Sequence, residues 1–295
     1  MLQGVFTALA TPFLQNGNLD KENLLKLLRA QLKAGVQGIV LLGTTAETPT
    51  LTSQEKKEIL DICIPEIKNA GVQLIIGVGT NNTVSTVENI QLAALYQPDA
   101  VLVVTPYYNK PNPAGMIVYF KAAAAQGLPI VLYHIPGRTG QKLSAQMLDT
   151  LLKEVPQIIA VKESDYDMTH ITDTAVYHKN RISYLCGNDD LFPQFLALQA
   201  SGIISAAACV CAPTFVKIYQ LFHANKPQEA FEIFTQVYPL IKACYLETNP
   251  TCIKYMLSKL GFGSQTARAP LGEISAENKA KIDTLLSQTN KEFLI

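Results

Sequence analysis

The chain has 295 residues, of which 48% are hydrophobic and 16% are charged, a composition typical of a globular protein with a large core. Its 24 lysines and arginines balance 24 acidic residues, so no long-range field favours nucleic acid or an anionic membrane, and we expect small-molecule partners. No apolar run reaches the ~18 residues of a membrane span, and the first residues do not resemble a secretory signal, so we expect a cytoplasmic protein.

Eight short runs rich in valine and isoleucine recur along the chain, and each is nearly continuous in apolar residues. This pattern is typical of strands that are covered on both faces, as in parallel sheets. The runs begin at Val5, Gly38, Gln73, Ala100, Pro129, Ile158, Ile182 and Gly202. We therefore expect eight strands in this order.

Helical patterns lie between these runs. The first contains Leu24, Leu25, Leu28 and Leu32 at helical spacing. Gly35 is expected to end that helix. After the second run, Thr52 and Glu55 have the spacing of a capping box, which predicts a helix that continues to Gly71.

Strands that alternate with helices predict an α/β fold with a parallel sheet. A closed (β/α)8 TIM barrel is favoured over an open doubly wound sheet because no GxGxxG motif follows the first run. No strand pattern appears from Pro213 onward. We expect a catalytic barrel over residues 1–212 and a C-terminal helical region, residues 213–295, packed on the barrel.

The cysteines and histidines do not have the spacing of a metal site. The six cysteines include no CxxC pair, so we expect small buried hydrophobic side chains rather than ligands or disulfides. Of the four histidines, His170 and His178 are eight residues apart, which is not a ligand spacing. We therefore expect no metal.

In a barrel of this kind, chemistry takes place where the strands end at their carboxyl edges. The residues expected there are Thr44, Thr45, Glu47, Tyr107, Tyr108, Tyr133, Arg138, Lys162 and Gly187. Hydroxyls, phenols, one lysine and one arginine would then face a common mouth.

Lys162 ends the apolar run Ile158–Val161, although lysine is rarely buried without a partner. At a dry rim its amine can act as a nucleophile that forms a Schiff base with a carbonyl, and Tyr133 on the preceding strand can carry protons. The alternative is a solvated loop lysine. Likewise, Thr44 and Thr45 could serve only to satisfy turn amides.

The loops after the last two strands contain no lysine, arginine or glycine-rich cradle. Barrels that bind phosphorylated substrates commonly hold the phosphate at these loops. A sugar-phosphate aldolase is therefore disfavoured.

The segments "GTTAET", "TPYYNKP", "YHIPGRTG" and "IIAVKES" occur in the order typical of pyruvate-dependent class I aldolases. Within that superfamily the chain most resembles the dihydrodipicolinate synthase family, and the resemblance extends to "ETNP" near the C-terminus. It implies a lyase that condenses pyruvate with L-aspartate 4-semialdehyde to 4-hydroxy-tetrahydrodipicolinate, the first committed step of diaminopimelate and lysine biosynthesis. A keto-deoxy sugar acid or sialic acid lyase, and a non-catalytic barrel that binds a keto acid, remain alternatives.

The resemblance also implies catalytic roles for matching residues. Lys162 would form the Schiff base with pyruvate, and no further cofactor would be needed. Tyr133 would shuttle protons through Thr44 to Tyr108 of a partner subunit. The family's usual assembly implies a homotetramer, built as a dimer of dimers.

Four further residues would bind the substrates. Thr45 and the backbone of Ile204 would hold the pyruvate carboxylate, and Arg138 would bind the carboxylate of the semialdehyde. Gly187, which matches the position after the seventh strand, is also assigned to substrate binding.

The chain departs from the family pattern at several positions, namely Ala46, His134, Tyr166, Asn188 and Ser85. The position after Tyr133 is usually an asparagine and here it is His134. Ala46 replaces a glycine, which would be strained if that position had a positive φ. In relatives that are inhibited by lysine, a glutamate at the place of Ser85 pairs with the inhibitor's amino group, so we expect weak or absent feedback by lysine.

Overall fold

The computed structural model describes residues 1–178 and 181–295. Its eight parallel strands form a closed barrel in chain order. They are β1 (Gly4–Ala8), β2 (Gly38–Leu41), β3 (Gln73–Gly77), β4 (Ala100–Val104), β5 (Ile130–His134), β6 (Ile158–Glu163), β7 (Ser183–Cys186) and β8 (Gly202–Ser205). Each begins within one residue of its predicted start, so the prediction of a (β/α)8 barrel is confirmed.

Twelve α-helices are found among the described residues. They are α1 (Lys21–Lys33), α2 (Ser53–Ala70), α3 (Thr83–Ala94), α4 (Pro113–Ala124), α5 (Pro136–Thr139), α6 (Ala145–Glu154), α7 (Met168–Tyr177), α8 (Phe192–Ala197), α9 (Ala208–His223), α10 (Pro227–Ala243), α11 (Thr251–Lys259) and α12 (Ala276–Gln288). Four short 3₁₀ turns are η1 (Thr44–Ala46), η2 (Thr48–Thr50), η3 (Asp189–Leu191) and η4 (Lys291–Phe293). In the part of the chain that is described, no helix is long and apolar enough to span a membrane.

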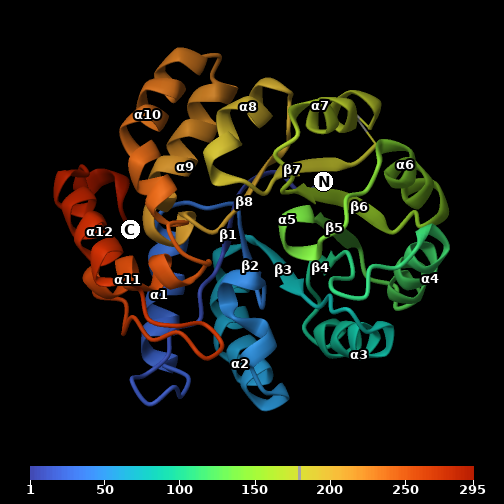
Figure 1. Cartoon of the computed structure of the whole chain (residues 1–295), viewed down its shortest axis with the longest axis horizontal. Helices are drawn as coiled ribbons and strands as arrows, with labels where there is room; N and C mark the ends of the chain where they lie inside the picture. Colours follow the sequence, from blue (N-terminus) through green and yellow to red (C-terminus); the bar gives the residue numbers. More distant parts are fainter. Residues whose placement is uncertain (179–180) are drawn as a thin grey trace. The chain divides into compact units, whose positions relative to one another are not determined.

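The chain divides into two compact units. The first unit comprises Met1–Gln3 and Gln73–Ile203, and the second comprises Gly4–Val72 and Ile204–Ile295. In the first unit, β3 to β7 pair in parallel with their neighbours, and the helices α3, α4, α6 and α7 lie along their outer side (Figure 1). Each of these helices packs on the next, so the strands are enclosed and their side chains are buried.

In the second unit, β1 pairs with β2, and α1 packs on α2 and α9. The predicted capping box is confirmed, because the Thr52 side chain accepts the Glu55 N–H and the Glu55 side chain accepts the Thr52 N–H. Gly71, at φ +67°, ends α2 as expected. On α1 the predicted apolar face was partly wrong: Leu27 and Gln31 are buried with Leu24 and Leu28, whereas Leu25 and Leu32 are half-buried.

After β8 the described chain is helical, as the sequence predicts. The helices α9 to α12, coloured from yellow-orange to red in Figure 1, pack on one another in the second unit. The predicted boundary between residues 212 and 213 falls inside α9, where Cys211 has a non-helical backbone, and the division into two domains there stays a prediction. All six cysteines are free and buried, as expected.

Candidate active site

Tyr133 and Lys162 lie side by side at the ends of β5 and β6. They are register partners across the two strands, so both side chains leave the sheet on the same face. Lys162 is 7% exposed and Tyr133 is 6% exposed, and the Lys162 Nζ lies 4.3 Å from the centre of the Tyr133 ring. The structure therefore brings together the predicted nucleophile and the predicted proton carrier.

This pair has the chemistry of Schiff-base formation. An amine in a shielded position can attack a carbonyl carbon, and the resulting carbinolamine must then gain and lose protons as water leaves. The Tyr133 ring lies beside the amine, which makes its hydroxyl the candidate to exchange those protons. The cation–π contact also holds the ammonium form close to the ring before reaction.

Gly187 approaches the end of β6 closely. Its N–H donates to the Glu163 carbonyl at 2.7 Å. A Cβ at this position would lie 2.1 Å from the Ser164 Oγ and 2.8 Å from the Glu163 carbonyl oxygen, so only glycine fits there without a shift of the chain. The structure thus shows a packing reason for Gly187, and its predicted contact with substrate stays a prediction.

Two predicted site residues of the first unit are exposed at its surface. Tyr108 is 89% exposed and has a left-handed backbone, with φ +69°, in the loop after β4. Arg138 lies in the short helix α5, which Gly140 ends at φ +66°. Within this unit the structure therefore joins Tyr133 to Lys162, whereas Tyr108 and Arg138 are exposed.

In the second unit, Thr44 and Thr45 begin the 3₁₀ turn that follows β2. Thr45 is 2% exposed, and its Oγ1 accepts a hydrogen bond from the Asn249 Nδ2 at 3.2 Å. The positive φ of this turn, +54°, belongs to Glu47, so Ala46 is not in the strained conformation considered above. Ile204 is fully buried in β8.

A second buried lysine lies close to this turn. The Lys254 Nζ is 2.5 Å from the Glu47 Oε1 and 3.9 Å from the centre of the Phe13 ring. The other Glu47 oxygen accepts the Arg268 N–H at 2.7 Å. Burial lowers the pKa of Lys254 to about 8, although Glu47 opposes this shift. Sequence reasoning missed both Asn249 and Lys254, and the only available signal was the "ETNP" segment.

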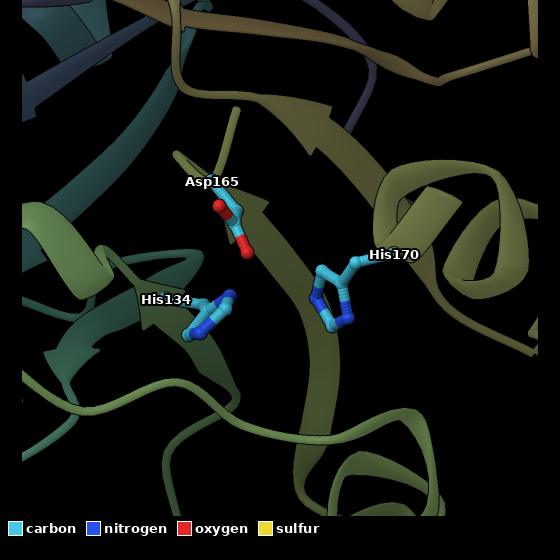
Figure 2. Close-up of side chains that lie close together, drawn as sticks. All are labelled: His134, Asp165 and His170. Carbon is cyan, nitrogen blue, oxygen red and sulfur yellow. The ribbon is translucent and has the colours of Figure 1, made fainter. Parts of the chain in front are cut away.

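His134, Asp165 and His170 are the one group of three potential metal ligands among the described residues, with nitrogen and oxygen atoms within 4.8 Å of one another (Figure 2). Their hydrogen bonds do not suit a metal. The His134 Nε2 accepts the Leu143 N–H at 3.0 Å, so the proton is on Nδ1, which donates to Glu163. The Lys142 Nζ lies 2.9 Å from the Asp165 carboxylate. These groups form a network of hydrogen bonds and ion pairs instead.

Comparisons with known proteins identify relatives of this chain over nearly its full length. The family model described as the Dihydrodipicolinate synthetase family matches residues 1–289. The 4-hydroxy-tetrahydrodipicolinate synthase of Methanococcus aeolicus is 37% identical over 288 residues, which is 97% of this chain and 99% of that protein. The corresponding protein of Methanocaldococcus jannaschii is 36% identical over 287 residues, covering 97% and 98% of the two chains.

A solved structure is similar over nearly the whole chain. The 4-hydroxy-tetrahydrodipicolinate synthase of Methylacidiphilum fumariolicum SolV superposes with a TM-score of 0.94 at 31% identity. The match covers 99% of this chain and 97% of that chain.

Proposed function

The chain belongs to the dihydrodipicolinate synthetase family, and from this membership we propose how its residues perform the family's reaction. The protein is a lyase that condenses pyruvate with L-aspartate 4-semialdehyde to 4-hydroxy-tetrahydrodipicolinate, in diaminopimelate and lysine biosynthesis. The observation that supports the assignment of residues is the buried Lys162 amine, 4.3 Å from the centre of the Tyr133 ring.

The proposed reaction begins when the Lys162 amine attacks the keto carbon of pyruvate. The carbinolamine loses water to give an iminium, and Tyr133 supplies and recovers the protons of this step. Loss of a methyl proton gives an enamine, whose carbon attacks the aldehyde and forms the new carbon–carbon bond. The amino group of the second substrate then attacks the iminium carbon, closes the ring and releases Lys162.

The proposed substrate contacts involve two carboxylates. Thr45 and the Ile204 backbone would hold the pyruvate carboxylate, and Arg138 would bind the carboxylate of the semialdehyde through charge-assisted hydrogen bonds. The bond from Asn249 supports the role of Thr45, because it orients the threonine hydroxyl. Gly187 would offer its backbone to the substrate, for which its closely packed position is suitable.

The proposal extends to assembly and to the proton relay. Tyr108, at 89% exposure, is available to a second copy of the chain, where it would join Thr44 and Tyr133 in passing protons to bulk water. The assembly would be a homotetramer in the cytoplasm. Apart from the covalent Schiff base, the reaction would use no cofactor and no metal.

Borohydride trapping tests this function. Reduction in the presence of pyruvate should attach one pyruvate-derived group to the peptide that contains Lys162, and none should form in Lys162→Ala. Steady-state assays with L-aspartate 4-semialdehyde, a keto-deoxy sugar acid and sialic acid should show turnover with the semialdehyde alone. An adduct on another lysine would overturn the residue assignment, and trapping without any turnover would point to a keto-acid-binding protein.

A further inference from the structure

The Glu163 carboxylate is hydrogen-bonded to two imidazoles on the face of β5 and β6 opposite to Tyr133 and Lys162. His134 follows Tyr133 on β5 and Glu163 follows Lys162 on β6, and the two residues are register partners. Because successive side chains of a strand point to opposite faces, they project to the side away from Tyr133 and Lys162. His170, from the first turn of α7, completes the group.

The hydrogen bonds of this group are directional. The His134 Nδ1 lies 2.8 Å and 3.0 Å from the two Glu163 oxygens, and the His170 Nε2 lies 3.2 Å from Oε2. The Asp165 N–H donates to Oε1 at 2.7 Å. Since the Leu143 N–H occupies the His134 Nε2, the His134 Nδ1 is a donor, and Glu163 accepts from three groups.

The pKa shifts of Glu163 and His170 agree with this geometry. Glu163 is 0% exposed, and burial alone would raise its pKa, but the bonds from His134 and His170 hold it below the usual value. The bond to Glu163 raises the pKa of His170, despite burial of the imidazole. The buried carboxylate therefore stays ionised and needs its imidazole donors.

The group also joins the segments that carry the proposed site residues. The Ser164 N–H donates to the His134 carbonyl at 2.8 Å, which links the ends of β6 and β5. Leu143 belongs to the loop that follows α5, so its bond to His134 fixes that loop to β5. Lys142 of the same loop lies 2.9 Å from Asp165 and 2.7 Å from Asp167, just after β6.

We propose that His134, Glu163 and His170 form a positioning network for the reaction, which fixes the ends of β5 and β6 so that Lys162 and Tyr133 keep their mutual placement. The inference rests on the function proposed above, because the pair it positions is the reacting pair. The network touches neither substrate, and it acts through the backbone of the two strands. A misplacement of about 1 Å in a reacting group can cost roughly 10²-fold in rate, so the effect should appear in kcat.

Two substitutions of His134 test its hydrogen bond to Glu163. His134→Leu removes the donor to Glu163, whereas His134→Asn places an amide N–H where the imidazole Nδ1–H stood and keeps that donor. His178→Leu is the matched control, since it removes another buried imidazole, at the opposite end of α7. Each protein is assayed at a temperature at which circular dichroism shows it to be fully folded.

We expect His134→Leu to lower kcat, and the single-turnover rate of borohydride-trappable adduct formation with pyruvate, by about tenfold or more. The KM for pyruvate should change less than about threefold, because the groups proposed to hold its carboxylate are unchanged. His134→Asn should recover at least half of the lost rate, and His178→Leu should match the wild type.

Three results would overturn the proposal of a positioning network. Wild-type trapping rates in folded His134→Leu would exclude a positioning role, and failure of His134→Asn to recover any rate would exclude the Glu163 bond as its cause. A stoichiometric metal ion in the purified protein that is absent from His134→Leu would assign the group to metal binding. If the wild type forms no adduct at Lys162, the proposed function itself is wrong, which is a separate outcome.

Discussion

Two buried lysines, Lys162 and Lys254, offer a direct test of which amine reacts. They are 7% and 2% exposed, and we predict that exchanging each for methionine separates reactivity from stability. Lys162→Met should abolish the trapped adduct and leave the free energy of unfolding within about 1 kcal/mol, because methionine can also pack on the Tyr133 ring. Lys254→Met should leave the trapped adduct on Lys162 unchanged and lower the free energy of unfolding.

The loss of stability expected for Lys254→Met follows from the surroundings of its ion-pair partner, Glu47. The Glu47 carboxylate, whose side chain is 1% exposed, would keep the Arg268 N–H at 2.7 Å but lose the ammonium at 2.5 Å. Removing one member of a buried ion pair costs about 3–5 kcal/mol, because the remaining charge is left uncompensated. Adding Glu47→Gln to Lys254→Met removes that charge and should restore roughly half of the loss.

The pKa explains why Lys254 should not be trapped. With a pKa of about 8, roughly a tenth of the Lys254 amines are neutral at pH 7, and the nitrogen is buried with an N–H directed at Glu47. Urea unfolding followed by far-ultraviolet circular dichroism gives the stabilities, and peptide mass spectrometry locates the adduct. An adduct on the Lys254 peptide, or unchanged stability of Lys254→Met, would refute the reasoning.

Four further predictions concern single residues. Tyr133→Phe should lower kcat roughly 10²-fold or more while the ring stays over Lys162, and near-wild-type turnover would exclude Tyr133 as the proton carrier. Arg138→Ala should impair use of the semialdehyde far more than pyruvate trapping, and equal damage to both would indicate a structural arginine. His170 has a raised pKa, so its bond to Glu163 adds stability that is complete below the unfolded pKa near 6.5 and is lost as pH rises through the folded pKa. The stability gap between wild type and His170→Gln should therefore narrow from pH 5 to pH 9, and a constant gap would contradict this. Inhibition by L-lysine should be weak or absent, because Ser85 lacks the carboxylate whose bond contributes roughly 1.5–3 kcal/mol, and half-inhibition below about a millimolar would show otherwise.

The strands and the contact between Tyr133 and Lys162 were predictable from the sequence for a simple reason. Parallel strands buried on both faces appear as continuous apolar runs, so their first residues can be located to within one residue. Tyr133 and Lys162 are next to last in consecutive strands, and consecutive strands of a barrel are neighbours. Their contact therefore follows from the order of the elements alone.

Contacts made by distant parts of the chain were not predictable in this way. Asn249 contacts Thr45 across 204 residues, and Lys254 contacts Glu47 across 207 residues. Asn249 lies in the turn before α11 and Lys254 lies in α11, and the placement of this segment depends on tertiary packing rather than on a local pattern. A lysine in an apolar helix such as α11 gives no sign in the sequence of the carboxylate it will meet.

The hydrogen-bond network of His134, Glu163 and His170 was predictable only in part. Strand alternation alone places Glu163 and His134 together on the face away from Lys162 and Tyr133, because the register of one pair sets that of the next. Only His170 had to come from the structure, since it reaches the carboxylate from a helix. In our proposal the ends of β5 and β6 thus use one side-chain position for the reaction and the next for an anchor. Under this proposal a substitution at His134 changes no reacting atom but alters the support of Tyr133 beside it, so variation at His134 is expected to affect the reaction.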